Sequence, residues 1–155
     1  MKNVKKVQSW QVSEVELVYV NKMKSTERPV ITSSKTAYDV LMQHWDKKKI
    51  DYIEHFKILL LDKANRVLAV YEVGSGGLTA TFVDQRQVFC AGLLVKATAI
   101  ILAHNHPSGR LVASNEDQTL TRKMVEAGKI LDIQILDHLI VTSDGYYSFA
   151  DEGLI

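Results

Sequence analysis

The alternation of apolar and polar positions along the chain predicts a sheet protein with intervening helices. Five apolar runs have the length or the alternation of β-strands. They span residues 14–20, 54–62, 66–73, 97–104 and 132–142. The short turn at 63–65 makes the second and third runs the two arms of a hairpin, and residues 14–20 suit a sheet edge. Asp144-Gly145 is a further turn, after which residues 146–150 close the sheet.

Three segments between these runs have the periodicity of amphipathic helices, and each follows a capping residue. They run from Thr32, Ser33 or Ser34 to about Lys48, from Gln85 to about Lys96, and from Asn115 to about Ala127. Asp84 and Gln87 resemble a capping box at the start of the second helix, and Gly128 is a stop signal for the third. Strands and helices mix without strict alternation, so we expect an α/β fold in which helices flank a central mixed sheet.

Length and composition suit one compact domain. The chain has 155 residues, of which 46% are hydrophobic and 24% charged, and this is enough to bury a core. No repeat or linker-like stretch interrupts it, so we expect an extension at 1–33 with the edge strand and a domain at 34–155. No apolar run approaches the roughly 18 residues of a membrane span. The single cysteine, Cys90, fits a reducing compartment, most simply the cytoplasm, and we expect it to be a buried small hydrophobe.

Charge gives little support to a nucleic-acid partner. The formal net charge is +1, whereas nucleic-acid binding usually shows as a strongly basic surface. Residues 47–49, all lysine, are interpreted as the solvated end of the first helix, where cations complement the dipole. Residues 74–77 (GSGG) lack the residues that complete a phosphate-binding loop and are interpreted as a flexible connection. Because local patches can still act, nucleic acid stays a secondary alternative.

The segment HNHPSGRLVASNED, residues 104–117, gathers side chains that can bind a metal. His104 and His106 are two residues apart, so at the end of an extended strand both rings point to one side. Pro107 turns the chain out of the sheet. If Ser114 caps the following helix, Asp117 falls in its first turn. A loop of this length can return the Asp117 carboxylate to the two histidines.

Two imidazoles and one carboxylate suffice for a catalytic zinc site with a fourth position open to water. Zinc lowers the pKa of such a water toward about 7, which makes it a nucleophile at neutral pH. Individual residues of this set also have simpler interpretations. Ser114 and Asp117 by themselves form a helix-capping pattern, and His104 by itself would more often be a satisfied histidine at a sheet end. A 2-His-1-carboxylate set is also typical of Fe(II) oxygenases.

The spacing His104-x-His106-x7-Ser114-x2-Asp117 resembles the JAMM motif of the MPN/JAB1 metalloproteases. The segments GSGGLT, ILAHNHPSG and LTRKMVEAGKILDIQILDHLIVTSDGYYSFADEG are similar to the bacterial RadC-like branch, the "DNA repair protein RadC" family. The resemblance extends from about Lys35 to the C-terminus. It implies a JAB1/MPN (cytidine-deaminase-like) three-layer α/β/α sandwich around a curved mixed sheet. It further implies one Zn²⁺ on His104, His106 and Asp117, and a Ser114 hydroxyl that hydrogen-bonds the developing oxyanion.

The resembled family also uses a glutamate from an upstream strand as general acid and base. Glu54 and Glu72, at opposite ends of the predicted hairpin, are the candidates here. The family places this residue at the start of the strand after the first helix, which favours Glu54. His55 should face away from Glu54 and is treated as structural. His138 lies in a segment that recurs in RadC-like proteins, and both a structural and a supporting role remain open.

The resemblance implies a zinc-dependent hydrolase of amide or isopeptide bonds, whose partner is a peptide or isopeptide substrate. Two departures from the family matter. Longer RadC-like proteins carry a helix-hairpin-helix-like region suited to DNA contact, and residues 1–30 look nothing like it. Ala113 stands where the family often has proline, which affects only loop stiffness. An accessory module in DNA metabolism, with a structural or vestigial metal, is the alternative function.

Overall fold

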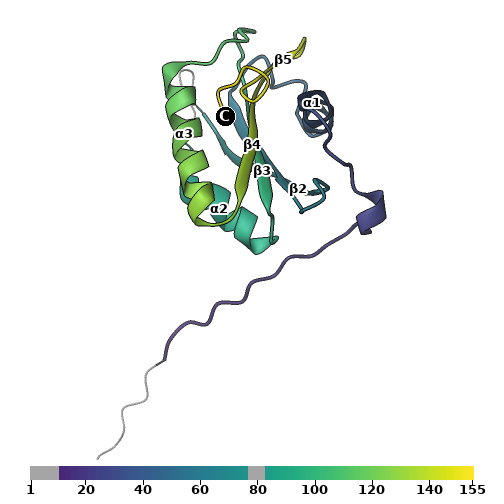
Figure 1. Ribbon diagram of the computed structural model, residues 1–155, viewed down its shortest axis with the longest axis vertical. Helices are drawn as coiled ribbons and strands as arrows, with labels where there is room; N and C mark the ends of the chain where they lie inside the picture. The colour runs from purple at the N-terminus through teal and green to yellow at the C-terminus, as the bar shows by residue number, and fades with distance from the viewer. Residues whose placement is uncertain (1–10, 77–82) are drawn as a thin grey trace, which may run out of the picture.

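A five-stranded mixed sheet forms the centre of the protein, as a computed structural model shows for residues 11–76 and 83–155 (Figure 1). The strands are β1 (His55–Leu61), β2 (Val67–Ser75), β3 (Ala99–Asn105), β4 (Gln134–Val141) and β5 (Tyr146–Ser148). Their spatial order is β2-β1-β3-β4-β5. β3 and β4 pair in parallel, and the other pairings between the described strands are antiparallel. The predicted mixed sheet is confirmed.

Helices cover both faces of this sheet. They are α1 (Ser34–Gln43), α2 (Gln85–Leu94) and α3 (Asn115–Ile130), and a short 3₁₀ helix η1 (Ser25–Glu27) precedes them. Figure 1 shows α1 on one side of the sheet and α2 with α3 on the other. This arrangement confirms the expected α/β/α layers. No helix in the described ranges has both the length and the apolar character needed to cross a membrane.

The sheet divides the core into two apolar layers. Between the sheet and α1 lie Ala37, Leu41, Trp45, Ile50, Leu59, Leu61, Ile101, Leu139 and Val141. Between the sheet and the other two helices lie Phe56, Ile58, Leu60, Phe89, Ile100, Leu102, Met124 and Ile135. β1 and β3 are buried on both faces, which explains why their sequences are nearly continuous apolar runs rather than alternating ones.

The first helix is shorter than predicted. Ser33 caps it, because its side chain accepts a hydrogen bond from the backbone N–H of Thr36, but the helix ends at Gln43 rather than near Lys48. Asp46 then turns the chain, since its carbonyl accepts hydrogen bonds from residues 49 and 50. The exposed lysines 47–49 therefore lie in this turn and not at a helix end.

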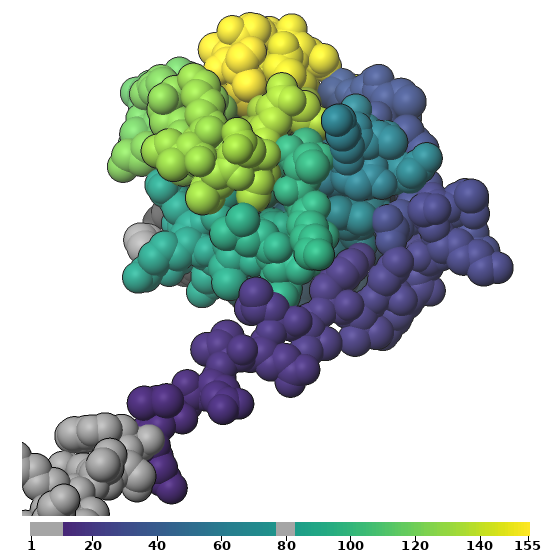
Figure 2. All heavy atoms as spheres, turned by 60° about the horizontal axis from the view of Figure 1, so that its bottom comes forward, coloured from purple at the N-terminus to yellow at the C-terminus, as the bar shows by residue number. Residues whose placement is uncertain are grey.

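The predicted edge strand at 14–20 is wrong. Within the described part of the chain, these residues pair with no strand, and the segment extends away from the domain (Figure 2). Its link to the sheet is the Tyr19 hydroxyl, which donates to the Leu68 carbonyl at 3.0 Å. A strand needs a backbone ladder to a neighbour, and Val15 and Leu17 stay 86% and 78% exposed without one. The alternation of apolar and polar residues at 14–20 does not by itself provide a strand with which this segment can pair.

Two further expectations for the second helix are corrected. Cys90 is exposed rather than buried, because Val88, Phe89 and Gly92 form the inward face of α2. The Asp84 side chain accepts from the N–H of Arg86, so the predicted capping box with residue 87 is not formed. The proposed flexible connection at 74–77 begins inside β2, and its last residue lies outside the described residues.

Gly128 does not stop the third helix, which continues to Ile130. The helix ends one turn later, with Asp132 in the left-handed region at φ 54°. The N–H of Ile133 reaches back to the Gly128 carbonyl at 2.9 Å, which is the bond that defines a Schellman ending. A Cβ on Gly128 would lie 2.3 Å from the Ile133 carbonyl oxygen. The glycine therefore permits the close return of the chain into β4.

α2 ends in the same way and provides a matched control. Lys96 has φ 56°, and the N–H of Ala97 donates to the Gly92 carbonyl at 2.8 Å. A Cβ on Gly92 would meet only the tips of side chains at 3.2 Å or more. Backbone atoms cannot move aside as such side-chain tips can, so the two glycines should differ in their tolerance of alanine.

We expect Gly128→Ala to lower the free energy of unfolding by about 3 kcal/mol, at the upper end of overpacking effects. Gly92→Ala should stay within about 1 kcal/mol of the parent, since the gain in helix propensity offsets a small clash. Urea unfolding of the metal-free proteins, followed by circular dichroism, measures both. Equal losses in the two variants would contradict the role assigned to the Ile133 carbonyl.

Candidate metal centre

The fold brings both halves of the candidate centre to the carboxyl end of β3. A parallel pair of strands requires a crossover, and α3 supplies it between β3 and β4. The crossover helix runs back along the sheet, so its first turn lies at the end where β3 stops. His104 lies in β3, His106 follows its last residue, and Asp117 lies in the first turn of α3. The predicted return of the carboxylate to the histidines is observed.

Three ligand atoms converge at this point, all within 4.8 Å of one another. The Nε2 atoms of His104 and His106 are 3.0 Å apart. Asp117 Oδ1 lies 3.2 Å from His104 Nε2, and the other carboxylate oxygen, Oδ2, lies 3.8 Å from His106 Nε2. Tetrahedral zinc with bonds of about 2.0–2.1 Å separates its ligand atoms by roughly 3.3 Å. The separations of His104 Nε2 from His106 Nε2 and from Asp117 Oδ1 lie close to that value, so the donor set can hold a zinc ion.

The second ring nitrogen of each histidine is also engaged. His106 Nδ1 lies 2.7 Å from the backbone carbonyl of Arg110, and His104 Nδ1 lies 2.8 Å from His138 Nε2. A carbonyl only accepts, so His106 carries its proton on Nδ1 and, when neutral, turns the lone pair of Nε2 to the cluster. Metal-binding histidines are usually oriented by such outer hydrogen bonds.

Asp117 and Ser114 hold each other in a capping box at the start of α3. The Ser114 side chain accepts from the Asp117 N–H at 3.0 Å, and Asp117 Oδ2 accepts from the Ser114 N–H at 2.8 Å. Burial works to raise the pKa of Asp117, but the hydrogen bonds from His104 and Ser114 and the charge of His104 outweigh it. The pKa of the carboxyl is therefore held well below its ordinary value, and the ligand is anionic at neutral pH.

Asn105, between the two histidines, holds the strand ends beside the candidate centre, a contact that sequence reasoning missed. It is fully buried, and its amide donates to the carbonyls of Ile50 and Ile53 at 2.6 and 2.9 Å. Its Oδ1 accepts from the N–H of His55 at 2.7 Å. Asn105 thus ties the turn before β1 to the end of β3 and fixes the backbone on both sides of Glu54. The sequence offered one sign of this role: Asn105 is a polar residue in an apolar strand, and its side chain points away from the two histidines.

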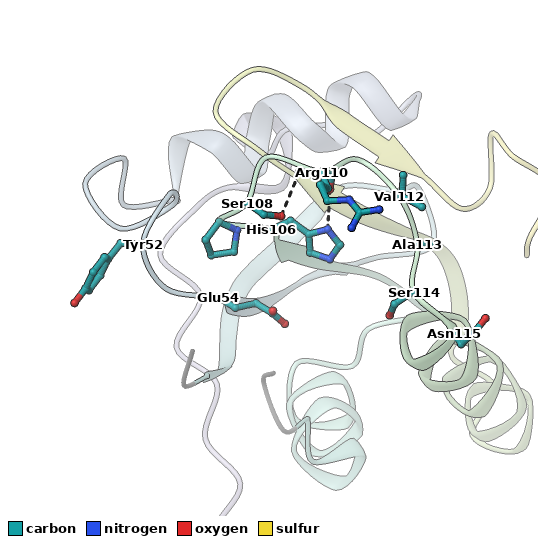
Figure 3. A pocket seen from close by; sticks show the side chains of 10 residues that line it. Tyr52, Glu54, His106, Ser108, Arg110, Val112, Ala113, Ser114 and Asn115 are labelled. Carbon is teal, nitrogen blue, oxygen red and sulfur yellow. Dashed lines mark hydrogen bonds between the residues drawn. The ribbon is translucent and has the colours of Figure 1, made fainter. Parts of the chain in front are cut away.

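Glu54 lines a groove of about 540 Å³ that opens beside His106 and Ser114 (Figure 3). Tyr52, Arg110 and Ala113 contribute to its walls. The Glu54 carbonyl accepts from the N–H of residue 76 at 2.8 Å, which anchors this end of β1 to the end of β2. Of the two predicted acid–base candidates, Glu54 is therefore the one that lines the groove.

Glu72, the other candidate, belongs to a separate ion pair. Its Oε2 lies 2.6 Å from Lys57 Nζ, and its Oε1 lies 3.3 Å from His55 Nδ1. Burial works to raise the pKa of Glu72, but the hydrogen bonds and charges of Lys57 and His55 lower it overall. None of these three residues lines the groove. His55 pairs with Glu72 and does not line the groove that Glu54 lines, so its treatment as a structural residue is retained.

His138, whose role the sequence left open, contacts the candidate centre directly. Besides His104, it meets the Thr121 hydroxyl, which lies 2.6 Å from His138 Nδ1. Its side chain is fully buried, and burial lowers its pKa far below the ordinary value. Thr121 was not singled out by sequence reasoning; its position four residues after Asp117, on the same helix face, was the available signal.

Comparison with known proteins places the chain in a family. Residues 31–154 match the RadC-like JAB domain, and the chain belongs to this family. A UPF0758 protein of Flavobacterium johnsoniae is 45% identical over 126 residues, which cover 80% of this chain and 53% of that protein. A UPF0758 protein of Symbiobacterium thermophilum is 47% identical over 103 residues, which cover 66% of this chain and 44% of that protein. The chain thus spans about half the length of the curated relatives it matches.

We expect Ser114→Ala to lower the free energy of unfolding of the metal-free protein by about 1 kcal/mol, because it removes the N-cap of α3. Ser33→Ala, which removes the N-cap of α1, is the matched control and should cost a similar amount. Urea unfolding measures both. An unchanged stability in Ser114→Ala beside a loss in Ser33→Ala would show that Ser114 does not act as a cap.

Proposed function

We propose that the protein is a zinc-dependent hydrolase of amide or isopeptide bonds. The observation that carries this proposal is the convergence of His104, His106 and Asp117 at the edge of an open groove that Glu54 and Ser114 also line. Membership of the RadC-like JAB domain family supports it. The groove beside His106 has a volume of about 540 Å³, and we propose that it takes a peptide or isopeptide substrate.

The three converging residues would hold one zinc ion, with two neutral imidazoles and one carboxylate as ligands. This donor set carries one negative charge, so the loaded site is net positive and suits the oxygen of a carbonyl group. Zinc bound there would supply a Lewis acid and an activated water. His106 is oriented for this by Arg110, and Asp117 by the capping box.

Glu54 would act as the general base and then as the general acid. Its carboxylate takes the proton from the attacking water and returns it to the nitrogen of the leaving amine. Its place on the groove wall near His106 suits this transfer (Figure 3). The fixed backbone around Glu54, held by Asn105, limits the range of positions that the carboxylate can reach.

Ser114 would stabilise the oxyanion that develops on the substrate carbonyl. Its oxygen already accepts the Asp117 N–H, so the hydroxyl hydrogen can be donated into the groove. Donors aimed at a developing oxyanion are worth about 2.7–4 kcal/mol in other hydrolases. The Ser114 oxygen thus caps the helix as an acceptor, while its hydroxyl hydrogen would donate a hydrogen bond to the substrate oxyanion.

We expect about one zinc ion per chain in the purified protein and loss of zinc in Asp117→Ala, because the carboxylate is the anionic ligand. Elemental mass spectrometry measures zinc and iron together. Asp84→Ala removes an acidic N-cap outside the cluster and should keep the metal. Iron in place of zinc would favour oxygen chemistry. No metal in the parent, even after zinc is offered under reducing conditions, would overturn the hydrolase proposal in favour of an accessory module.

We expect Glu54→Gln to retain zinc but to lose hydrolysis by about 10²–10⁴-fold, because it removes proton transfer and leaves the ligands in place. Glu72→Gln is the control outside the groove and should keep the parent rate. Cleavage of a fluorogenic library of peptide and isopeptide amides by zinc-loaded protein measures this. A Glu54→Gln variant as active as the parent would contradict the role given to Glu54.

A further inference from the structure

A continuous chain of hydrogen bonds connects two of the candidate metal ligands behind the site. It begins at the backbone carbonyl of Asp117, to which the Thr121 hydroxyl donates at 2.7 Å. The hydroxyl oxygen lies 2.6 Å from His138 Nδ1. The other ring nitrogen of His138 lies 2.8 Å from His104 Nδ1. Three hydrogen bonds thus run from the main chain of one ligand to the ring of another.

The Asp117 carbonyl at one end determines which atom donates and which accepts in each of these hydrogen bonds. A carbonyl only accepts and a hydroxyl has one proton, so the proton of Thr121 points at Asp117. The Thr121 oxygen must then accept, which places a proton on His138 Nδ1. With His138 uncharged, its Nε2 carries a lone pair and accepts from His104 Nδ1. His104 Nδ1 is therefore protonated, and Nε2 is left as the ring nitrogen that faces His106 and Asp117 and can bind the metal.

Packing keeps the members of this chain in place. His138 is fully buried and Thr121 is 2% exposed. The His138 ring stacks on Phe149 with centroids 4.8 Å apart and meets the edge of Phe56 at 5.6 Å. Its backbone N–H donates to Asp137 Oδ1 at 2.7 Å. The ring is thus held by two aromatic side chains and at its backbone, with little freedom to turn.

We propose that Thr121 and His138 are positioning residues that set the tautomer of His104 and prepare its Nε2 for the metal. This inference rests on the proposed metal site, but its central claim concerns the protein without metal. The fold places the protons on His138 Nδ1 and His104 Nδ1, so the choice of His104 Nε2 as the metal-binding atom is made before zinc arrives. Outer hydrogen bonds of this kind orient metal-binding histidines and fix their tautomers.

Substitution of Thr121 by valine should reverse the donor and acceptor roles in the hydrogen bond between His138 and His104. Valine keeps the shape of the side chain but cannot accept, so a proton on His138 Nδ1 would be buried without a partner. His138 would then carry its proton on Nε2 and donate to His104 Nδ1. His104 would in turn be protonated on Nε2, the atom that must bind zinc. Thr121→Ser keeps the hydroxyl and is the matched control.

The test is ¹⁵N NMR of the histidine rings at pH 8 in zinc-free protein, for the parent, Thr121→Val and Thr121→Ser. We expect His138 and His104 to be protonated on Nδ1 in the parent and in Thr121→Ser, and on Nε2 in Thr121→Val. A parent His138 protonated on Nε2 would overturn the inference, and so would an unchanged tautomer in Thr121→Val.

Zinc affinity, measured by competition with a chromophoric chelator, gives the second readout. We expect Thr121→Val to weaken zinc binding about tenfold or more, as is usual for outer-sphere changes, and Thr121→Ser to bind like the parent. Thermal unfolding of the zinc-free variants separates this effect from a merely structural one. A valine variant that loses stability but binds zinc like the parent would overturn the inference.

The two proposals fail in different ways. A parent protein that binds no zinc but shows His138 and His104 protonated on Nδ1 would reject the proposed function and retain the hydrogen-bond chain. A parent that binds zinc with His138 protonated on Nε2 would retain the metal site and reject the positioning role of Thr121 and His138.

Discussion

The parallel pairing of β3 with β4 is the constraint on which the rest of this structure depends. It requires a crossover between the two strands, and α3 supplies this crossover, with its first turn at the end where β3 stops. The same pairing places His138 of β4 diagonally across from His104 of β3. Leu102 is the register partner of His138, and His104, two residues further along β3, lies on the same face of the sheet. The ligands, the capping box and the buried histidine therefore follow from one topological choice.

Two buried polar side chains near the candidate centre, Asn105 and Asp137, are hydrogen-bonded to the backbone. Asn105 uses its amide hydrogens and its oxygen on three backbone groups. Asp137 accepts from Ser148 and from two backbone N–H groups, and burial still raises its pKa above the ordinary value. Buried polar groups cost free energy unless they are paired. The hydrogen bonds of Asn105 and Asp137 therefore favour the observed arrangement of the strands around the candidate centre.

Several elements were predictable because their causes are local. The buried runs at β1 and β3, the cap at Ser33 and the turn at 144–145 each depend on neighbouring residues. Other expectations failed where a distant contact decides. Gly128 was interpreted as a stop signal for the helix. The structure shows instead that a glycine is needed there because the Ile133 carbonyl oxygen would lie 2.3 Å from any Cβ. The alternating residues 14–20 look like a strand, yet they pair with no strand in the described part of the chain, although β2 is an edge strand.

The sequence by itself determined which side chains can bind a metal, because the spacing from His104 to Asp117 is short and its strand, loop and cap are local features. It also determined the layers of the fold, through the periods of the apolar positions. The tertiary structure alone decided that Glu54 rather than Glu72 reaches the groove, and that Thr121 and His138 connect the ligands. Those contacts join residues far apart in the chain, and strand order and register, which set them, are not written in any local pattern.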